Sequence, residues 1–163
     1  MTEGEKRGRL GNGSSNPYFE GRKFTEPTFC PRCGLVYRNG RWQTDTDFDR
    51  TSSTSTSHCP ACRREMDGIP GGLVMLRGSY FAAHREEILN IVKNQAATAG
   101  AHRPLQRIMS TTPVDGGVEI ATTNGHLAQR IGKAVESACK GSLSIKHGDG
   151  DSLMRLYWER DVS

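Results

Sequence analysis

Two pairs of cysteines constrain this chain more than any other feature. Cys30 and Cys33 lie in "CPRCG", and Cys59 and Cys62 lie in "HCPACRR". A two-residue spacer lets both sulfurs of a pair bind one ion, and two such pairs complete a tetrahedral four-thiolate site. Zinc favours this ligand set, and a site closed by four sulfurs is structural because it leaves no position for water. We therefore predict a structural Zn²⁺ ion bound by these four cysteines.

Other interpretations of the cysteines remain open at this point. The 25 residues between the pairs exceed the usual spacing of about 15–20, and a Ser/Thr-rich loop at 51–57 accounts for the excess. "CPRC" alone is also compatible with a redox dithiol, although no βαβ pattern surrounds either pair. His58 adjoins Cys59 and is an alternative ligand. Cys139 stands alone, and we expect a small buried residue there.

Composition favours a cytoplasmic protein. Only 34% of the 163 residues are apolar, and no apolar stretch approaches the roughly 20 residues that span a bilayer. No apolar segment follows the charges of "MTEGEKRGRLGNGSSN", which argues against a secretory signal. Thiols stay reduced in the cytoplasm, and this favours a metal over disulfides.

The chain divides into four parts by pattern. Residues 1–27, rich in Gly, Ser, Asn and basic residues, are expected to form a flexible basic arm. Residues 28–66 form the predicted zinc ribbon. Residues 67–80 begin with "DGIPGG" and are expected to be a linker. Residues 81–160 form a predicted α+β domain.

The C-terminal part has the periodicity of helices and short strands. Apolar spacing predicts a helix at Phe81–Ala97 and a second helix capped by Asn124 and ended by Gly141. Turns at Asp115–Gly116 and Gly148–Gly150 predict two hairpins. The expected fold class is α+β: the ribbon, then an α-β-β-α-β-β domain with a mainly antiparallel four-stranded sheet.

Arginines and aromatic residues surround the cysteine pairs. The chain carries 22 Lys and Arg against 18 Asp and Glu, and its first 43 residues hold 8 basic and 4 acidic residues. Guanidinium groups bind phosphates, and aromatic rings stack on unpaired bases. Tyr37 and Trp42 can do this, but Trp42 is expected to pack on the ribbon. The candidate nucleic-acid contacts are Arg32, Arg38, Arg41, Arg63 and Arg64 beside the cysteines, and Lys6, Arg7 and Arg9 in the arm.

Several motifs together resemble a small bacterial zinc-ribbon family over residues 7–160. They are "EPTFCPRCG", "GRW", "CPAC", "YFAAHREEIL", "RPLQRIM", "HLAQRIGKAV" and "LYWER". More distantly, the chain resembles the N-terminal region of the large ribosomal subunit export adaptor, the nonsense-mediated decay factor three family. That family's zinc module sits on the large ribosomal subunit, so the resemblance implies RNA or ribosome binding. It extends residue by residue only to the four cysteines, and this chain lacks the adaptor's further domains.

The residues suggest binding rather than catalysis. Gly132-Lys133 has no upstream glycine at phosphate-loop spacing, and the histidines are scattered. "HREE" at 84–87 is expected to be an exposed helix face. We predict a non-enzymatic, ribosome-associated zinc-ribbon protein that binds RNA. A protein–protein adaptor or regulatory module is the alternative, and an enzyme in the α+β domain would require a pocket with convergent polar groups.

Overall fold

The computed structural model describes residues 18–19, 21–45, 55–148 and 153–162. It mixes helices and strands, which confirms the α+β prediction. The chain divides into two compact units, which we call the cysteine unit (Met1–Asp67) and the sheet unit (Gly68–Ser163). Among the helices of the described ranges, none combines the length and apolar character needed to cross a membrane.

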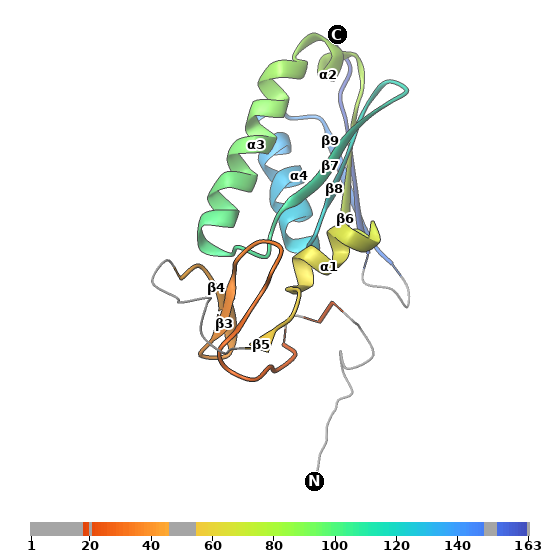
Figure 1. Cartoon of the computed structure of the whole chain (residues 1–163). Coiled ribbons are helices and arrows are strands. Elements are labelled where there is room, and N and C mark those ends of the chain that lie inside the picture. The colour runs from red at the N-terminus through yellow and green to blue at the C-terminus, as the bar shows by residue number, and fades with distance from the viewer. Residues whose placement is uncertain (1–17, 20, 46–54, 149–152, 163) are drawn as a thin grey trace. The chain divides into compact units, whose positions relative to one another are not determined.

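The cysteine unit is built from very short strands and one helix (Figure 1). Its sheet has the order β4-β3-β2-β5, with β2 parallel to β5 and the other pairs antiparallel. The elements are β2 (Thr28–Phe29), β3 (Val36–Arg38), β4 (Arg41–Gln43), β5 (Ser55–Thr56) and α1 (Pro60–Asp67). Strands of two or three residues bury little apolar surface, so this unit needs another source of stability.

Residues assigned to the basic arm from sequence take part in this unit. The Phe24 ring packs edge-on against Tyr37 and Trp42, with ring centroids 5.2 and 5.3 Å apart. The Glu26 carboxylate accepts hydrogen bonds from the backbone N–H groups of Asn39 (2.6 Å) and Gly40 (3.2 Å). Both turn residues have positive φ, as an Asn-Gly hairpin turn requires. The folded part of this unit therefore begins before residue 28.

The sheet unit contains a five-stranded sheet of order β7-β8-β6-β10-β9. The strands are β6 (Gly72–Arg77), β7 (Ile108–Val114), β8 (Gly117–Thr122), β9 (Ser142–His147) and β10 (Met154–Glu159). The helices are α2 (Ser79–Ala83), α3 (Arg85–His102) and α4 (Gly125–Cys139). The turn at Asp115–Gly116 is confirmed as the connection of β7 and β8, whereas part of the turn predicted at Gly148–Gly150 lies outside the described residues.

The expected linker at 67–80 is corrected by the structure, because most of it is strand β6 and the start of α2. Gly71 and Gly72, at the start of the strand, allow close packing and do not form a hinge. A Cβ at Gly71 would lie 2.6 Å from the Thr123 carbonyl oxygen, and one at Gly72 would lie 2.6 Å from the Ala128 Cβ. Glycine is required where two parts of the backbone approach this closely.

The predicted four-stranded, mainly antiparallel sheet is corrected as well. β6 is the central strand and pairs in parallel with β10, from Gly72↔Met154 to Arg77↔Glu159. The remaining pairs of this sheet are antiparallel. The parallel pair joins segments about eighty residues apart in sequence, so local patterns did not reveal it.

The helix predicted at Phe81–Ala97 is two helices. The chain breaks at His84, whose ring stacks on Tyr80 with a centroid separation of 4.1 Å. The break lets Phe81 enter the core from α2, while Ile88 and Val92 enter it from α3. α3 then continues through Gly100 to His102.

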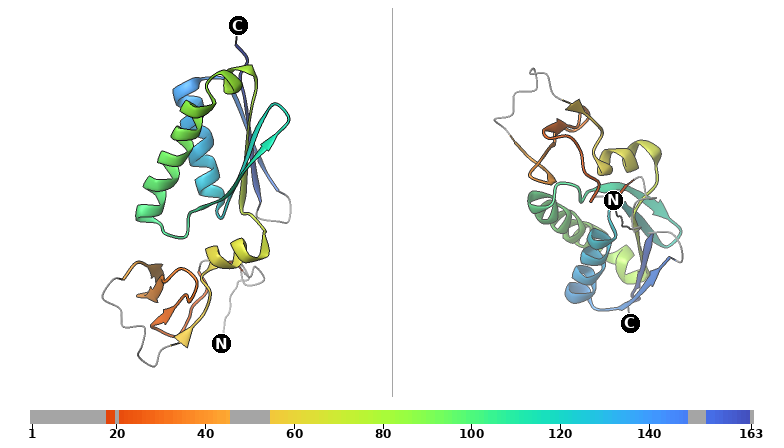
Figure 2. Two further views of the ribbon diagram at one scale, coloured as in Figure 1. Left: turned by 45° about the horizontal axis from the view of Figure 1, so that its top comes forward. Right: turned by 90° about the horizontal axis from the view of Figure 1, so that it is seen from below.

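The core lies between the sheet and the two long helices, which cover the same face of the sheet (Figures 1 and 2). Val74, Leu76, Leu156 and Trp158 come from the central strands and are almost completely buried. At Gly132, a Cβ would lie 2.5 Å from a Leu156 methyl, so glycine allows α4 to pack closely on β10. This core belongs entirely to the sheet unit.

Candidate metal centre

The first cysteine pair lies in the tight turn between β2 and β3. The Cys30 N–H donates to the Leu35 carbonyl (2.8 Å), and the Gly34 N–H donates to the Cys30 carbonyl (2.9 Å). Gly34 has φ 84°, which glycine adopts without strain. These bonds fold the loop back on itself and bring the two thiols to one side.

The second pair is held by a helix and not by a tight turn. Cys59 immediately precedes α1, and Cys62 lies in its first turn. Pro60 occupies the first helical position, where its missing N–H is no loss. The Cys62 N–H donates a hydrogen bond to the Cys59 sulfur (3.4 Å). Cys59 thus accepts from the first turn of the helix, as the side chain of a helix N-cap residue does. Arg63 stands where the first pair has Gly34 because the chain here continues as a helix.

The sulfur atoms of the four cysteines lie close together. The Sγ atoms of Cys30, Cys33, Cys59 and Cys62 lie within 4.8 Å of one another. The Cys33 and Cys59 sulfurs are 3.8 Å apart, close to the ~3.8 Å edge of a tetrahedron with metal–sulfur bonds of about 2.3 Å. None of the five cysteines, all of which lie in the described ranges, forms a disulfide. The arrangement can hold a metal ion, and the prediction of a four-cysteine site is confirmed to that extent.

The thiols are placed so that a cation would replace their protons. The hydrogen bond with Cys33, and then burial, raise the pKa of Cys59 well above its usual range. Crowded buried thiols disfavour the charged form until an opposite charge is supplied. A metal ion supplies that charge, and metal binding then releases the protons. Without metal, the raised pKa makes the Cys59 thiol a poor nucleophile, because little of it is present as thiolate.

Aromatic residues of the β3–β4 hairpin pack against each other. Tyr37 and Trp42 are cross-strand partners with ring centroids 5.5 Å apart, and both are less than 5% exposed. Trp42 therefore packs on the hairpin, as the sequence analysis expected, and Tyr37 does so as well. Neither ring is presented for base stacking.

The five arginines beside the cysteines have different contacts in the structure. Arg32 forms an ion pair with Glu65, and its hydrogen bonds with Cys62 and Glu65 raise its pKa. The Arg63 side chain donates to the His58 carbonyl (3.1 Å) and the Ser57 hydroxyl (3.2 Å). Arg32 and Arg63 thus hold parts of the unit together.

The other three arginines differ in exposure. Arg64 is only 8% exposed, and its guanidinium lies 4.3 Å from the centre of the Tyr18 ring. Arg38 and Arg41 are exposed and face each other across the hairpin turn. Arg38 also forms an ion pair with Asp45 (3.0 Å). Lys6, Arg7 and Arg9, the arm residues of the predicted nucleic-acid site, lie outside the described residues.

A second basic surface lies on the sheet unit, and the sequence analysis missed it. We call it the helix face: five Lys and Arg residues from the middle of α3, the loop that follows α3, and the first nine residues of α4. They are Lys93, Arg103, Arg107, Arg130 and Lys133. The signal was available, because residues 88–107 and 124–135 contain no Asp or Glu. The two stretches had no evident connection until the packing of α3 on α4 joined them.

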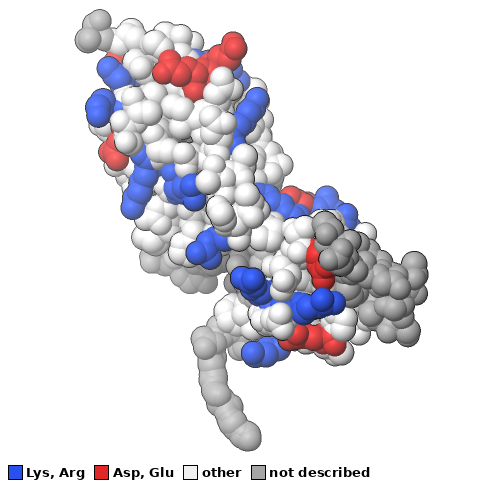
Figure 3. Space-filling view, turned by 90° about the vertical axis from the view of Figure 1, so that its left-hand side faces the viewer, with Lys and Arg blue, Asp and Glu red and all other residues white. Residues whose placement is uncertain are grey.

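The geometry of the helix face suits anions. Arg103, Gln106, His126 and Arg130 line a shared hollow. The Arg130 Nε donates to the Gln95 Oε1 (2.7 Å), a neutral partner that leaves the positive charge intact. Figure 3 shows Lys and Arg side chains across this side of the unit, with most of the Asp and Glu side chains toward one end.

Two comparisons with known proteins found no match. No protein-family model matches it, and no curated protein sequence matches it. The resemblance drawn from the sequence motifs therefore stays a prediction.

Proposed function

We propose that this chain is a zinc protein that binds RNA through the helix face, with the cysteine unit as a metal-stabilised accessory module. The proposal rests on the helix face, whose two segments contain no Asp or Glu. Five cationic side chains, four of them exposed, come from two segments that packing brings together, and no carboxylate interrupts either segment. Such a surface attracts a polyanion and gains affinity by releasing its counterions.

Zinc is the metal that fits the sulfur site best. Four thiolates in a tetrahedral arrangement suit Zn²⁺ or iron, and zinc has no redox chemistry to damage a structural site. When bound, the ion would supply stability rather than a reaction, since the four cysteines complete its coordination. Cys30 and Cys33 would hold it from the turn, and Cys59 and Cys62 from the start of α1.

The RNA partner we propose is ribosomal, in line with the sequence resemblance, and the protein acts by binding rather than by catalysis. The arginines at the hairpin turn, Arg38 and Arg41, form a smaller second contact. Like charges opposite each other on a hairpin are unfavourable, and the ion pair of Arg38 with Asp45 offsets part of this repulsion.

The proposal is tested by RNA binding of paired variants at several salt concentrations. Arg103→Gln with Arg130→Gln should weaken binding to single-stranded RNA and to purified ribosomes by about tenfold. It should also lower the salt slope by roughly 0.7 for each lost phosphate contact. Arg38→Gln with Arg41→Gln should have a smaller effect.

Lys146→Gln with Arg155→Gln is the matched control. These two residues form a cross-strand pair on β9 and β10, and the variant makes the same change in net charge. Equal losses from all three pairs would show non-specific attraction and contradict the proposal. Unchanged RNA binding in every variant, together with capture of a protein partner, would favour the adaptor function instead.

A further inference from the structure

The sheet unit contains an open cleft that the proposed function does not use. It has a volume of about 650 Å³ and lies beside the β7–β8 turn, α2 and the start of α3. Small-molecule sites commonly have volumes of roughly 300–1,000 Å³. Each lining residue belongs to the sheet unit, so the cleft is a feature of that unit alone.

Two glycines that line this cleft are required by close contacts with neighbouring backbone. Gly78 has φ 111°, and a Cβ there would lie 2.0 Å from the Arg160 carbonyl oxygen. A Cβ at Gly117 would lie 1.9 Å from the Leu76 carbonyl oxygen. Because neither position can carry a side chain, this part of the wall is bare backbone. The cleft is therefore fixed by the fold and not by the chance conformation of a surface side chain.

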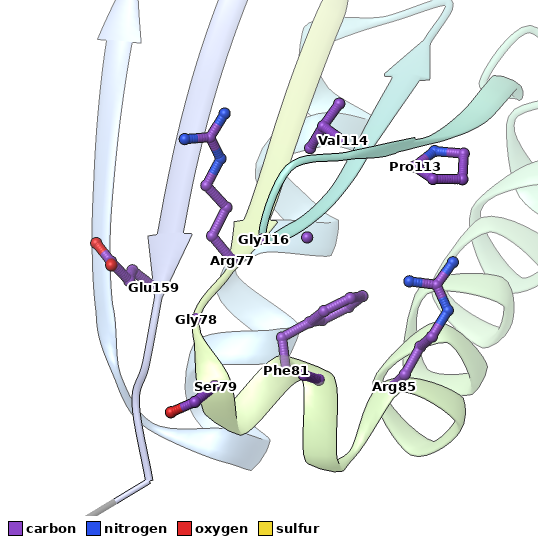
Figure 4. A pocket seen from close by; sticks show the side chains of 11 residues that line it. Arg77, Gly78, Ser79, Phe81, Arg85, Pro113, Val114, Gly116 and Glu159 are labelled. Atoms are coloured by element: carbon purple, nitrogen blue, oxygen red, sulfur yellow. The ribbon is translucent and has the colours of Figure 1, made fainter.

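The remaining wall is largely apolar. Phe81 and Ala82 contribute from α2, and Pro113 and Val114 contribute from the end of β7. Figure 4 shows Phe81 and Arg85 pointing from the helices toward the hairpin that carries Pro113 and Val114. An apolar group placed here would be removed from water on several sides, which favours its binding.

One guanidinium group borders this apolar wall. The Arg85 guanidinium lies 5.5 Å from the centre of the Phe81 ring. Within the described part of the chain, Arg85 forms no ion pair with a carboxylate. Arg77 and Glu159 are neighbours in register on β6 and β10, and Figure 4 shows both side chains away from Arg85. The cleft therefore combines an apolar lining with one cationic group, Arg85, at its edge.

We infer that this cleft binds a small amphipathic carboxylate, that is, an alkyl or aryl chain ending in one carboxylate. The carboxylate accepts two hydrogen bonds from Arg85. The apolar chain covers Ala82, Pro113 and Val114, which line the cleft around the buried Phe81 ring. This site is separate from the helix face, so it does not depend on RNA binding.

The apolar lining and the arginine together favour an amphipathic carboxylate over a neutral apolar molecule and over inorganic phosphate. A neutral apolar molecule would cover the apolar lining but would leave the Arg85 charge partly desolvated and unpaired, which is unfavourable. Inorganic phosphate would pair with Arg85 but would leave the apolar lining in water. A molecule with one anionic end and one apolar end satisfies both.

The test is a titration of the zinc-loaded full chain with octanoate and, separately, with octylamine, followed by amide chemical shifts. Octanoate should shift the amide signals of Val114, Gly116 and Gly117, and octylamine should bind at least about tenfold more weakly. Arg85→Gln should weaken octanoate binding by about ten- to a hundredfold, because a charge-assisted contact is lost.

Lys146→Gln, which removes one positive charge on β9, is the control and should leave octanoate binding unchanged. The proposal is overturned if octanoate produces no shifts at these amides or if octylamine binds equally well. It is also overturned if Arg85→Gln and Lys146→Gln have the same effect. RNA affinity measured on the Arg85→Gln protein should remain that of the unchanged chain.

Discussion

Each of the four cysteines is positioned by its immediate neighbours. Gly34 closes the turn after Cys33, and Pro60 starts the helix that carries Cys62. The ligand geometry is therefore encoded within two short segments, and the rest of the unit needs only to bring those segments together. Arg32 helps with this, since it bridges the first pair to Glu65 of α1. Arginines that bind the protein's own groups are less available to phosphates.

The metal site gives a prediction for single residues. Cys62→Ser should reduce the metal content of the purified protein from one zinc per chain to almost none, because three thiolates and a hydroxyl bind zinc much more weakly. Elemental analysis of protein purified under reducing conditions measures this. Cys139→Ser is the control: Cys139 is buried in the other unit, and its loss should leave the zinc content unchanged. Iron instead of zinc in the unchanged chain would contradict the assignment.

At the level of elements, α4 organises the sheet unit. It packs against β6, β8, β9 and β10 and also against α3. Its start is fixed by Asn124, whose side-chain oxygen accepts hydrogen bonds from the N–H groups of His126 (2.7 Å) and Leu127 (3.3 Å). The same helix presents Arg130 and Lys133 to the helix face, so its position affects both stability and binding.

Removing this cap should destabilise the sheet unit. Asn124→Ala should lower its free energy of unfolding by about 1 kcal/mol, since two N–H groups of the first turn lose their acceptor. Urea unfolding, followed by the amide signals of β6 and β10, gives the value. Asn90→Ala on the exposed side of α3 is the control, and it should be neutral or slightly stabilising because alanine favours helix. An equal cost from both changes would mean that the cap has no role.

At the level of the whole molecule, the two units are stabilised in different ways. The sheet unit buries a contiguous core that includes Leu76, Phe81, Ile131 and Trp158. The cysteine unit has strands of only two or three residues and a small aromatic cluster around Trp42. Below about 40 residues a core alone seldom suffices, and a metal commonly replaces it.

Chelation should therefore unfold one unit and spare the other. After zinc is removed under reducing conditions, the amides of Tyr37 and Trp42 should lose their dispersed signals and their protection from hydrogen exchange. The amides of Val74 and Trp158 should keep theirs. Readdition of zinc should restore the first set. Loss of protection throughout the chain would show that the sheet unit depends on the metal.

The sequence by itself determined the features that short segments encode. The four-cysteine cluster followed from the spacing within each pair. The β7–β8 turn followed from Asp115–Gly116, and the cap of α4 followed from Asn124. In each case the geometry depends on residues only a few positions apart, so the local pattern is sufficient.

Only the tertiary structure decided the features that depend on distant partners. β6 could be recognised as the central strand only when β8 and β10 paired with it, because its flanking glycines also suit a hinge. The sequence did not distinguish the arginines beside the cysteines from one another. In the structure they differ, because Arg64 is buried and Arg32 and Arg38 form ion pairs. The helix face and the cleft likewise join segments that lie apart along the chain, and the free energy of such contacts is specified only once the chain has folded.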